Sequence, residues 1–97
     1  MATFIALIDY TEQGIKNIKG APDRAAAFAE QARAMDVTIK DLYWTSGIHD
    51  GFLVFEAPDG ETASALLLSL AQAGNVSTHT LRAYDRSAMQ TILAKMK

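Results

Sequence analysis

Hydrophobic and polar residues change their period several times along the chain, and each change marks a boundary between a strand and a helix. Residues 3–10 are almost continuously apolar and rich in strand formers, which predicts a strand covered on both faces. Residues 52–55, Phe-Leu-Val-Phe, predict a central strand of the same kind. The Thr- and Val-rich residues 76–84 predict another strand.

Residues 37–45 alternate in the manner of a half-exposed strand, which predicts an edge strand. Strict alternation would put one set of side chains on one face, namely Val37, Ile39, Asp41 and Tyr43. Thr38, Lys40, Leu42 and Trp44 would then lie on the other. Tyr43 and Trp44 are therefore expected on opposite faces, so that one of them lines any cavity on a given side of the sheet.

Two longer segments between the strands carry apolar residues at helical spacing. The first begins at Pro22 and has its apolar stripe at Ala25, Phe28, Ala29, Ala32 and Met35. Ala21, just before it, offers no side-chain acceptor to cap the helix. The second follows Asp59, a good N-cap, and carries Ala63, Leu66, Leu67 and Leu70 before ending near Gly74 and Asn75, a suitable left-handed cap.

Two weaker segments complete the pattern. Residues 11–20 contain two glycines and predict a loop with about one turn of helix. Near the C-terminus, apolar residues recur at i, i+3, i+4 and i+7, at Met89, Ile92, Leu93 and Met96. This predicts a short amphipathic helix over residues 87–96, with Ser87 as its cap.

The resulting order is strand, helix, strand, strand, helix, strand and a C-terminal helix. With right-handed crossovers it predicts an α+β, ferredoxin-like βαββαβ sandwich: a four-stranded antiparallel sheet in the order 4-1-3-2, with two helices on one face. A chain of 97 residues is expected to form one domain over residues 1–97.

The second face of this sheet also needs a cover, because two strands are apolar on both sides. The simplest cover is the same face of a second copy, which predicts a homodimer or higher homo-oligomer with paired sheets. The amphipathic segment at residues 87–96 is the competing or additional cover.

Composition narrows the function classes. A net charge of −2 without a basic run argues against nucleic-acid binding, and the absence of cysteine excludes disulfides, thiolate nucleophiles and Cys-ligated metal centres. No segment has the apolar length of a membrane span, and the N-terminus lacks a basic signal-peptide start, so a cytoplasmic protein without a membrane partner is expected. The serines and glycines form no nucleophile elbow, phosphate loop or dinucleotide fingerprint.

Several short motifs together resemble the GYD-domain family. They are Tyr10-Thr11, Gln13-Gly14-Ile15, Asn17-Ile18-Lys19, Gly47-Ile48-His49-Asp50-Gly51, Val54, Glu56-Ala57-Pro58-Asp59, Gly74-Asn75-Val76 and Thr80-Leu81-Arg82-Ala83. The resemblance extends from about Phe4 to Leu93. It implies a small, mostly prokaryotic ferredoxin-like module of the dimeric alpha-beta-barrel type, without an established enzymatic activity. His49 stands where the family motif Gly-x-Tyr-Asp has its tyrosine.

The ligand-binding candidates are Tyr43, Trp44, His49, Asp50, Glu56, His79 and Arg82. His49 beside Asp50 fits either a general base oriented by a carboxylate or a solvated turn histidine, and the second interpretation is favoured. His79 would be a polar group in an apolar cavity, or a sheet histidine bonded to a neighbour. Glu56 and Arg82 fit an anion site or rim ion pairs. Within one subunit the two histidines are expected to lie too far apart to share a metal, because His49 should lie beside the start of the first strand and His79 several residues along the fourth. A metal site across a dimer is left open, and no metal, cofactor or catalytic residue is assigned.

Two functional hypotheses follow. The favoured one is a non-catalytic homo-oligomeric module whose paired sheets enclose a small organic ligand. The alternative is a cofactor-free enzyme of oxygenase or isomerase type, in which groups such as His79, Tyr43 and Glu56 orient a substrate in the sheet cavity. The alternative requires these three side chains to project into one enclosed pocket of a dimer, and it fails if they scatter over the helix-facing and solvent-facing sides.

Overall fold

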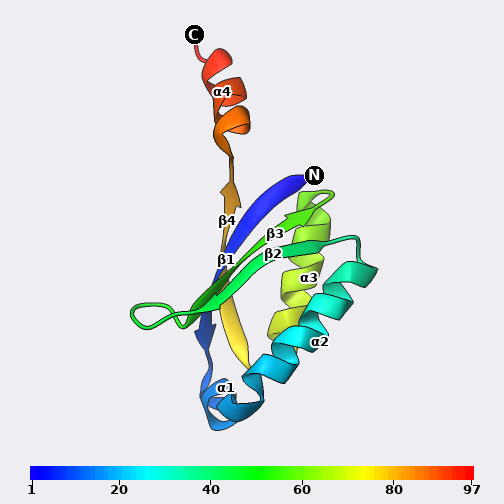
Figure 1. The fold of residues 1–97 in the computed structure, drawn as a ribbon, viewed down its shortest axis with the longest axis vertical. Coiled ribbons are helices and arrows are strands. Elements are labelled where there is room, and N and C mark those ends of the chain that lie inside the picture. The colour runs from blue at the N-terminus through cyan, green and yellow to red at the C-terminus, as the bar shows by residue number, and fades with distance from the viewer.

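A four-stranded antiparallel sheet forms the centre of the computed structural model, which describes all residues from 1 to 97 (Figure 1). Its strands are β1 (Ala2–Tyr10), β2 (Thr38–Trp44), β3 (Gly51–Ala57) and β4 (Val76–Ala83), arranged in the order β2-β3-β1-β4. This is the predicted order 4-1-3-2 read from the other edge. The prediction of an α+β chain compatible with the ferredoxin-like fold is confirmed.

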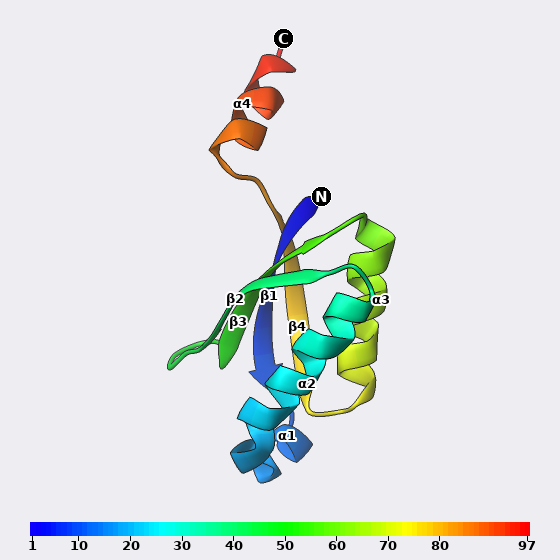
Figure 2. The ribbon, with the colours of Figure 1, turned by 45° about the vertical axis from the view of Figure 1, so that its right-hand side comes forward.

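Two helices, α2 (Ala21–Ala34) and α3 (Gly60–Gln72), lie side by side on one face of the sheet (Figure 2). As predicted, Asp59 caps α3 by accepting a hydrogen bond from the Thr62 amide at 2.7 Å, and Gly74 follows the helix with φ of 85°. Helix α2 begins after Gly20, and no side chain caps it. Its N-terminal amides are therefore unsatisfied by side chains.

The core lies between these helices and the sheet. Phe4 and Phe55 stack at its centre with ring centroids 5.4 Å apart, and Leu66 of α3 is fully buried above them. Ala32 of α2 and Ala63 of α3 are also buried, and their small side chains let the helices approach the sheet closely. The stripes predicted from helical spacing are thus the faces that pack on the sheet.

Strand β2 contains a register shift between Ile39 and Asp41 that strict alternation did not predict. Ile39 lies opposite Phe55 on the helix-covered face, whereas Asp41 lies opposite Val54 on the other face. The additional residue, Lys40, reverses the alternation, as a β-bulge does. Ile39 and Tyr43 therefore lie on opposite faces, and the prediction that they share one was wrong.

Residues 11–20 form more structure than the predicted loop with one turn. They fold into the α-helix α1 (Glu12–Lys16) and the 3-10 helix η1 (Ile18–Gly20). The Thr11 hydroxyl caps α1 by accepting a bond from the Gly14 amide at 3.1 Å. Gly14 packs directly on Asn75 at the start of β4, where a Cβ would lie 2.0 Å from the Asn75 carbonyl oxygen.

The C-terminal helix α4 (Arg86–Ala94) projects beyond the end of the sheet and covers neither face (Figure 1). Asp85 caps it by accepting a bond from the Ala88 amide at 2.8 Å, so the prediction of Ser87 as the cap was wrong. Asp85 precedes Ser87 by two residues and starts the helix earlier. The second face of the sheet is left uncovered within the chain. None of the helices is long and apolar enough to span a membrane.

Candidate functional site

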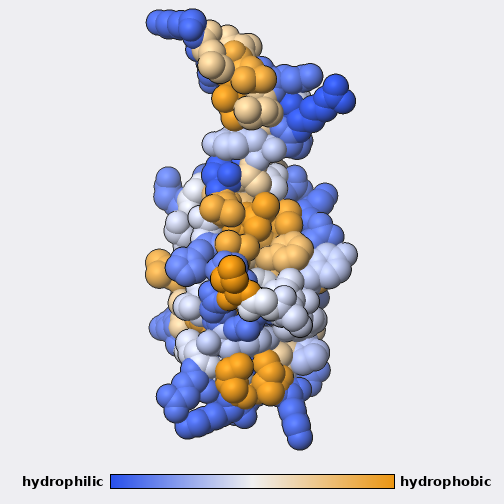
Figure 3. All heavy atoms as spheres, turned by 90° about the vertical axis from the view of Figure 1, so that its left-hand side faces the viewer, coloured by the Kyte–Doolittle hydropathy of each residue, from blue (hydrophilic) through white to orange (hydrophobic).

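The uncovered face of the sheet, called here the open face, consists of side chains arranged in cross-strand rows. One row runs Tyr43, Phe52, Leu7 and His79, and the next runs Asp41, Val54, Ile5 and Leu81. Apolar side chains gather at the middle of this face (Figure 3). Leu81 is 52% exposed and Tyr43 is 57% exposed. The middle of the open face is therefore a hydrophobic surface in contact with solvent.

A polar corner, formed by Asp9, His49 and His79, borders this surface. The Nδ1 atom of His49 lies 3.1 and 3.2 Å from the two carboxylate oxygens of Asp9, and both side chains are about one third exposed. An ionised carboxylate only accepts hydrogen bonds, so Nδ1 carries the proton and Nε2 of neutral His49 is left as the free acceptor. The imidazole of His79 lies beside it, with ring centroids 6.3 Å apart.

The expectation that His49 and His79 lie far apart was wrong. It placed His49 beside the start of the first strand, but β3 runs antiparallel to β1, and Gly51 pairs with Ile8 near the end of β1. The start of β4 lies beside the same end, since Leu7 pairs with His79. Antiparallel pairing on both sides of β1 therefore brings the two histidines to one corner. No three His, Asp or Glu side chains gather closely enough to hold a metal ion.

Asp50 supports the turn rather than the neighbouring imidazole. Its carboxylate accepts a bond from the Tyr10 amide at 2.8 Å, and its own amide donates to the Ile8 carbonyl at 2.9 Å. The Thr45 hydroxyl donates to the His49 carbonyl at 2.6 Å. The turn is thus fastened to β1, and His49 pairs with Asp9 instead of being the solvated turn histidine that the sequence favoured.

Tyr43, Glu56 and His79 all project from the open face, but they do not converge. Tyr43 stacks on Phe52 with centroids 5.5 Å apart, in the same row as His79. Glu56 lies opposite Thr3, at the other end of the face, where it pairs with Lys40 at 3.7 Å. Glu56 lies four positions after Phe52 along β3, which corresponds to roughly 13 Å. Glu56 is therefore a rim group rather than part of the polar corner.

Trp44 and Arg82 belong to the helix-covered side. The Trp44 indole Nε1 donates to the Tyr10 hydroxyl at 2.7 Å. The Arg82 guanidinium lies 5.4 Å from the centre of the Phe4 ring and 4.6 Å from that of Tyr84, and it donates to the Thr3 carbonyl at 3.0 Å. Neither side chain reaches the polar corner, and Tyr43 and Trp44 do face opposite ways as predicted.

Asp9 was missing from the predicted binding residues. The sequence places it at the end of the first strand, where an aspartate commonly stops a strand. The available signal was the antiparallel strand order itself, which brings the end of β1 beside the turn that carries His49. The polar corner thus combines an oriented imidazole, a second imidazole and an adjoining apolar surface. Such a combination can bind the polar group of a partly apolar molecule or accept a proton from it.

Comparison with known proteins gives one match. Residues 4–93 match the family model described as the GYD domain, which covers most of the 97-residue chain. No curated protein and no solved structure shows significant similarity to it.

Proposed function

The chain belongs to the GYD-domain family, and we propose that it acts as a homo-oligomeric binding module. In this proposal the open faces of two copies pack together and enclose a small, partly apolar organic ligand beside the polar corner. The observation that carries the proposal is the exposed hydrophobic middle of the open face, bordered by the Asp9–His49 pair. A surface of this kind on an otherwise folded chain is typical of an interaction site.

The open face alone is smaller than a stable dimer interface, so the proposed dimer needs an additional contact. Four strands about 4.8 Å apart and seven residues rising about 3.3 Å each give roughly 450 Å² of sheet. A stable interface needs about 800 Å² per partner. Helix α4 offers the additional area, because Met89, Ile92 and Leu93 are exposed along it. We propose that each α4 packs against the partner subunit, because α4 is exposed and covers neither face of its own sheet.

A matched pair of variants tests the sheet pairing. Leu81 lies on the open face and Leu68 lies on α3, and both are exposed, at 52% and 71%. Size-exclusion chromatography with light scattering should find a wild-type dimer at micromolar chain concentration. Leu81→Lys should weaken it by roughly 30-fold or more, since a buried leucine is worth about 2 kcal/mol and the lysine charge adds a penalty. Leu68→Lys should leave the dimer unchanged.

A wild-type monomer at micromolar concentration would refute the paired sheets. A Leu81→Lys dimer as tight as the wild type would place the interface elsewhere. Native mass spectrometry of freshly purified protein adds the second half of the test, because it reports the stoichiometry and any carried ligand together. The proposal expects two chains with one or two copies of a retained small organic molecule.

The polar corner also favours a second candidate, a cofactor-free enzyme with its active site between the sheets. The specific observation is that Asp9 holds His49 with Nε2 free beside the row that contains Tyr43 and His79. This is the arrangement of a general base with an orienting carboxylate. Incubating the carried molecule with protein in air separates the candidates. The binding module leaves its mass unchanged, whereas an enzyme changes it and His49→Gln abolishes the change.

A further inference from the structure

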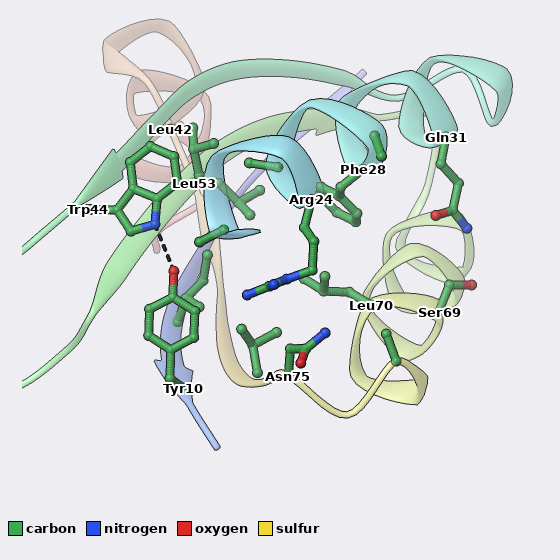
Figure 4. Close-up of a pocket in the computed structure, with 16 residues that line it drawn as sticks. Tyr10, Arg24, Phe28, Gln31, Leu42, Trp44, Leu53, Ser69, Leu70 and Asn75 are labelled. Atoms are coloured by element: carbon green, nitrogen blue, oxygen red, sulfur yellow. Dashed lines mark hydrogen bonds between the residues drawn. The ribbon is translucent and has the colours of Figure 1, made fainter. Parts of the chain in front are cut away.

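A cavity of about 270 Å³ lies on the other side of the sheet, between α2, α3 and the helix-covered face (Figure 4). Sixteen residues line it and twelve of them are hydrophobic. Phe28 and Leu70 contribute from the two helices, and Leu42 and Leu53 contribute from β2 and β3. The cavity is therefore apolar over most of its wall, and it is separated from the polar corner by the thickness of the sheet.

Arg24 brings an unbalanced charge into this cavity. Its Nη1 donates to the Asn17 carbonyl at 2.8 Å, whereas its Nη2 is buried without a hydrogen-bond partner. No aspartate or glutamate lines the cavity, and Arg24 makes no salt bridge. A guanidinium remains charged at physiological pH, and a buried N–H donor without an acceptor is costly. The half-buried Arg24 thus has no anionic partner, and one of its terminal nitrogens is buried without an acceptor.

Further donors surround the guanidinium. The Tyr10 hydroxyl accepts from the Trp44 indole, which leaves its own proton free to donate. The side-chain Oδ1 of Asn75 accepts from the Gln13 side-chain Nε2 at 3.1 Å, so the side-chain amide protons of Asn75 are free as well. Figure 4 shows Arg24 reaching between Tyr10 and Trp44 on one side and Asn75 on the other. One end of the cavity is therefore rich in donors.

The start of α2 adds to the positive potential. Ala21 and Arg24 from its first turn both line the cavity, and no side chain caps this helix. The N-terminus of a 14-residue helix carries a partial positive charge that favours an anion. The donor end of the cavity and the apolar walls together fit a molecule with an anionic head and a short hydrocarbon body.

We propose that this cavity binds a medium-chain monocarboxylate. Its carboxylate would accept from Arg24 Nη2, Tyr10 and Asn75, and its chain would lie between Phe28, Leu70 and the sheet. A volume of 270 Å³ corresponds to about nine water molecules of roughly 30 Å³ each, which suits an acid of about eight carbons. The site is independent of the open face, so its failure would leave the paired-sheet proposal standing.

Trp44 is the only tryptophan, and it lines the cavity, so its fluorescence reports on occupancy. Titration with octanoate should give a saturable change, and calorimetry should give one site per chain. Octanol and octylamine, of the same chain length without the negative charge, should bind at least about tenfold more weakly, because charge-assisted hydrogen bonds are the strong ones.

Arg24→Gln should weaken octanoate binding by roughly 10- to 100-fold while leaving octanol binding unchanged. Retained octanol binding shows that the cavity of the variant is intact. Arg33→Gln is the matched control, since Arg33 lies on the same helix and pairs with Glu30 at the surface. The proposal is overturned if octanoate shows no saturable binding, if octanol binds as well as octanoate, or if Arg24→Gln and Arg33→Gln bind octanoate equally.

Discussion

Replacing Gly14 with alanine is expected to destabilise the protein, although alanine is the better helix former. A Cβ at this position would lie 2.0 Å from the Asn75 carbonyl oxygen, where ordinary contact begins at 3.4 Å. Helix α1 and the start of β4 would have to separate by about 1.4 Å. Gly14 is buried and belongs to the family-like Gln13-Gly14-Ile15 motif, so the close approach of the two backbones explains the glycine.

The expected loss of stability follows from the hydrogen bonds between α1 with its cap and the residues that lead into β4. The Thr11 amide donates to the Asn75 carbonyl at 3.1 Å and the Thr11 hydroxyl donates to the Gly74 carbonyl at 2.6 Å. Gln13 adds a bond to the Ala73 carbonyl at 3.0 Å. At about 1 kcal/mol each, their loss costs about 2–3 kcal/mol. Alanine recovers up to about 1 kcal/mol of helix propensity. The net loss of about 1–2 kcal/mol lowers Tm by roughly 5–15 °C.

Gly60→Ala is the matched control, because Gly60 begins α3 and a Cβ there meets nothing within 4 Å. It should leave the stability unchanged or raise it by up to about 1 kcal/mol. Urea and thermal unfolding followed by circular dichroism, at one fixed chain concentration, measure both variants. If Gly14→Ala were as stable as Gly60→Ala, the close approach of α1 to β4 would be refuted.

Two further predictions concern single carboxylates. The hydrogen bonds from Thr62 lower the pKa of Asp59 below its ordinary value of 3.8. The stability that Asp59 contributes is therefore complete above that value and is lost as the pH falls through the lower folded-state pKa. In urea unfolding, the wild type should be more stable than Asp59→Asn at pH 6, and this difference in stability should narrow in acid; a difference that does not depend on pH would contradict the cap. Asp9→Asn should reduce the Nδ1-protonated tautomer of neutral His49, as seen by ¹⁵N NMR of the imidazole, while leaving His79 as the internal reference. An unchanged His49 tautomer would show that Asp9 does not set it.

The sheet could be predicted because its signals are local. Two-sided apolarity marks residues 3–10 and 52–55 as central strands, and right-handed crossovers then leave one antiparallel order. The bulge at Lys40 was not predictable in this way. The residue types of β2 carry no signature of a bulge, and only the pairing with β3 shows which residue is extra.

The candidate sites depended on contacts between distant residues, and these were predicted poorly. Forty positions separate Asp9 from His49, and their pairing follows from the register of β1 and β3 rather than from either local sequence. Arg24 was overlooked because a charged residue early in a helix is usually solvated. Its spacing was informative, since Arg24 and Phe28 are four apart and lie on the same side of α2, toward the cavity.

The end of β1 connects the two candidate sites. Successive side chains of a strand point to opposite faces, so Asp9 holds His49 on the open face while Tyr10 lines the cavity under the helices. Asp50 fixes both, because its carboxylate accepts from the Tyr10 amide and its own amide fastens the turn that carries His49. Leu81 and Arg24 each serve one site only. Asp50 thus holds the Tyr10 backbone and the turn that carries His49 against the end of β1, and this gives the aspartate of the Gly47–Gly51 motif a structural role beside both candidate sites.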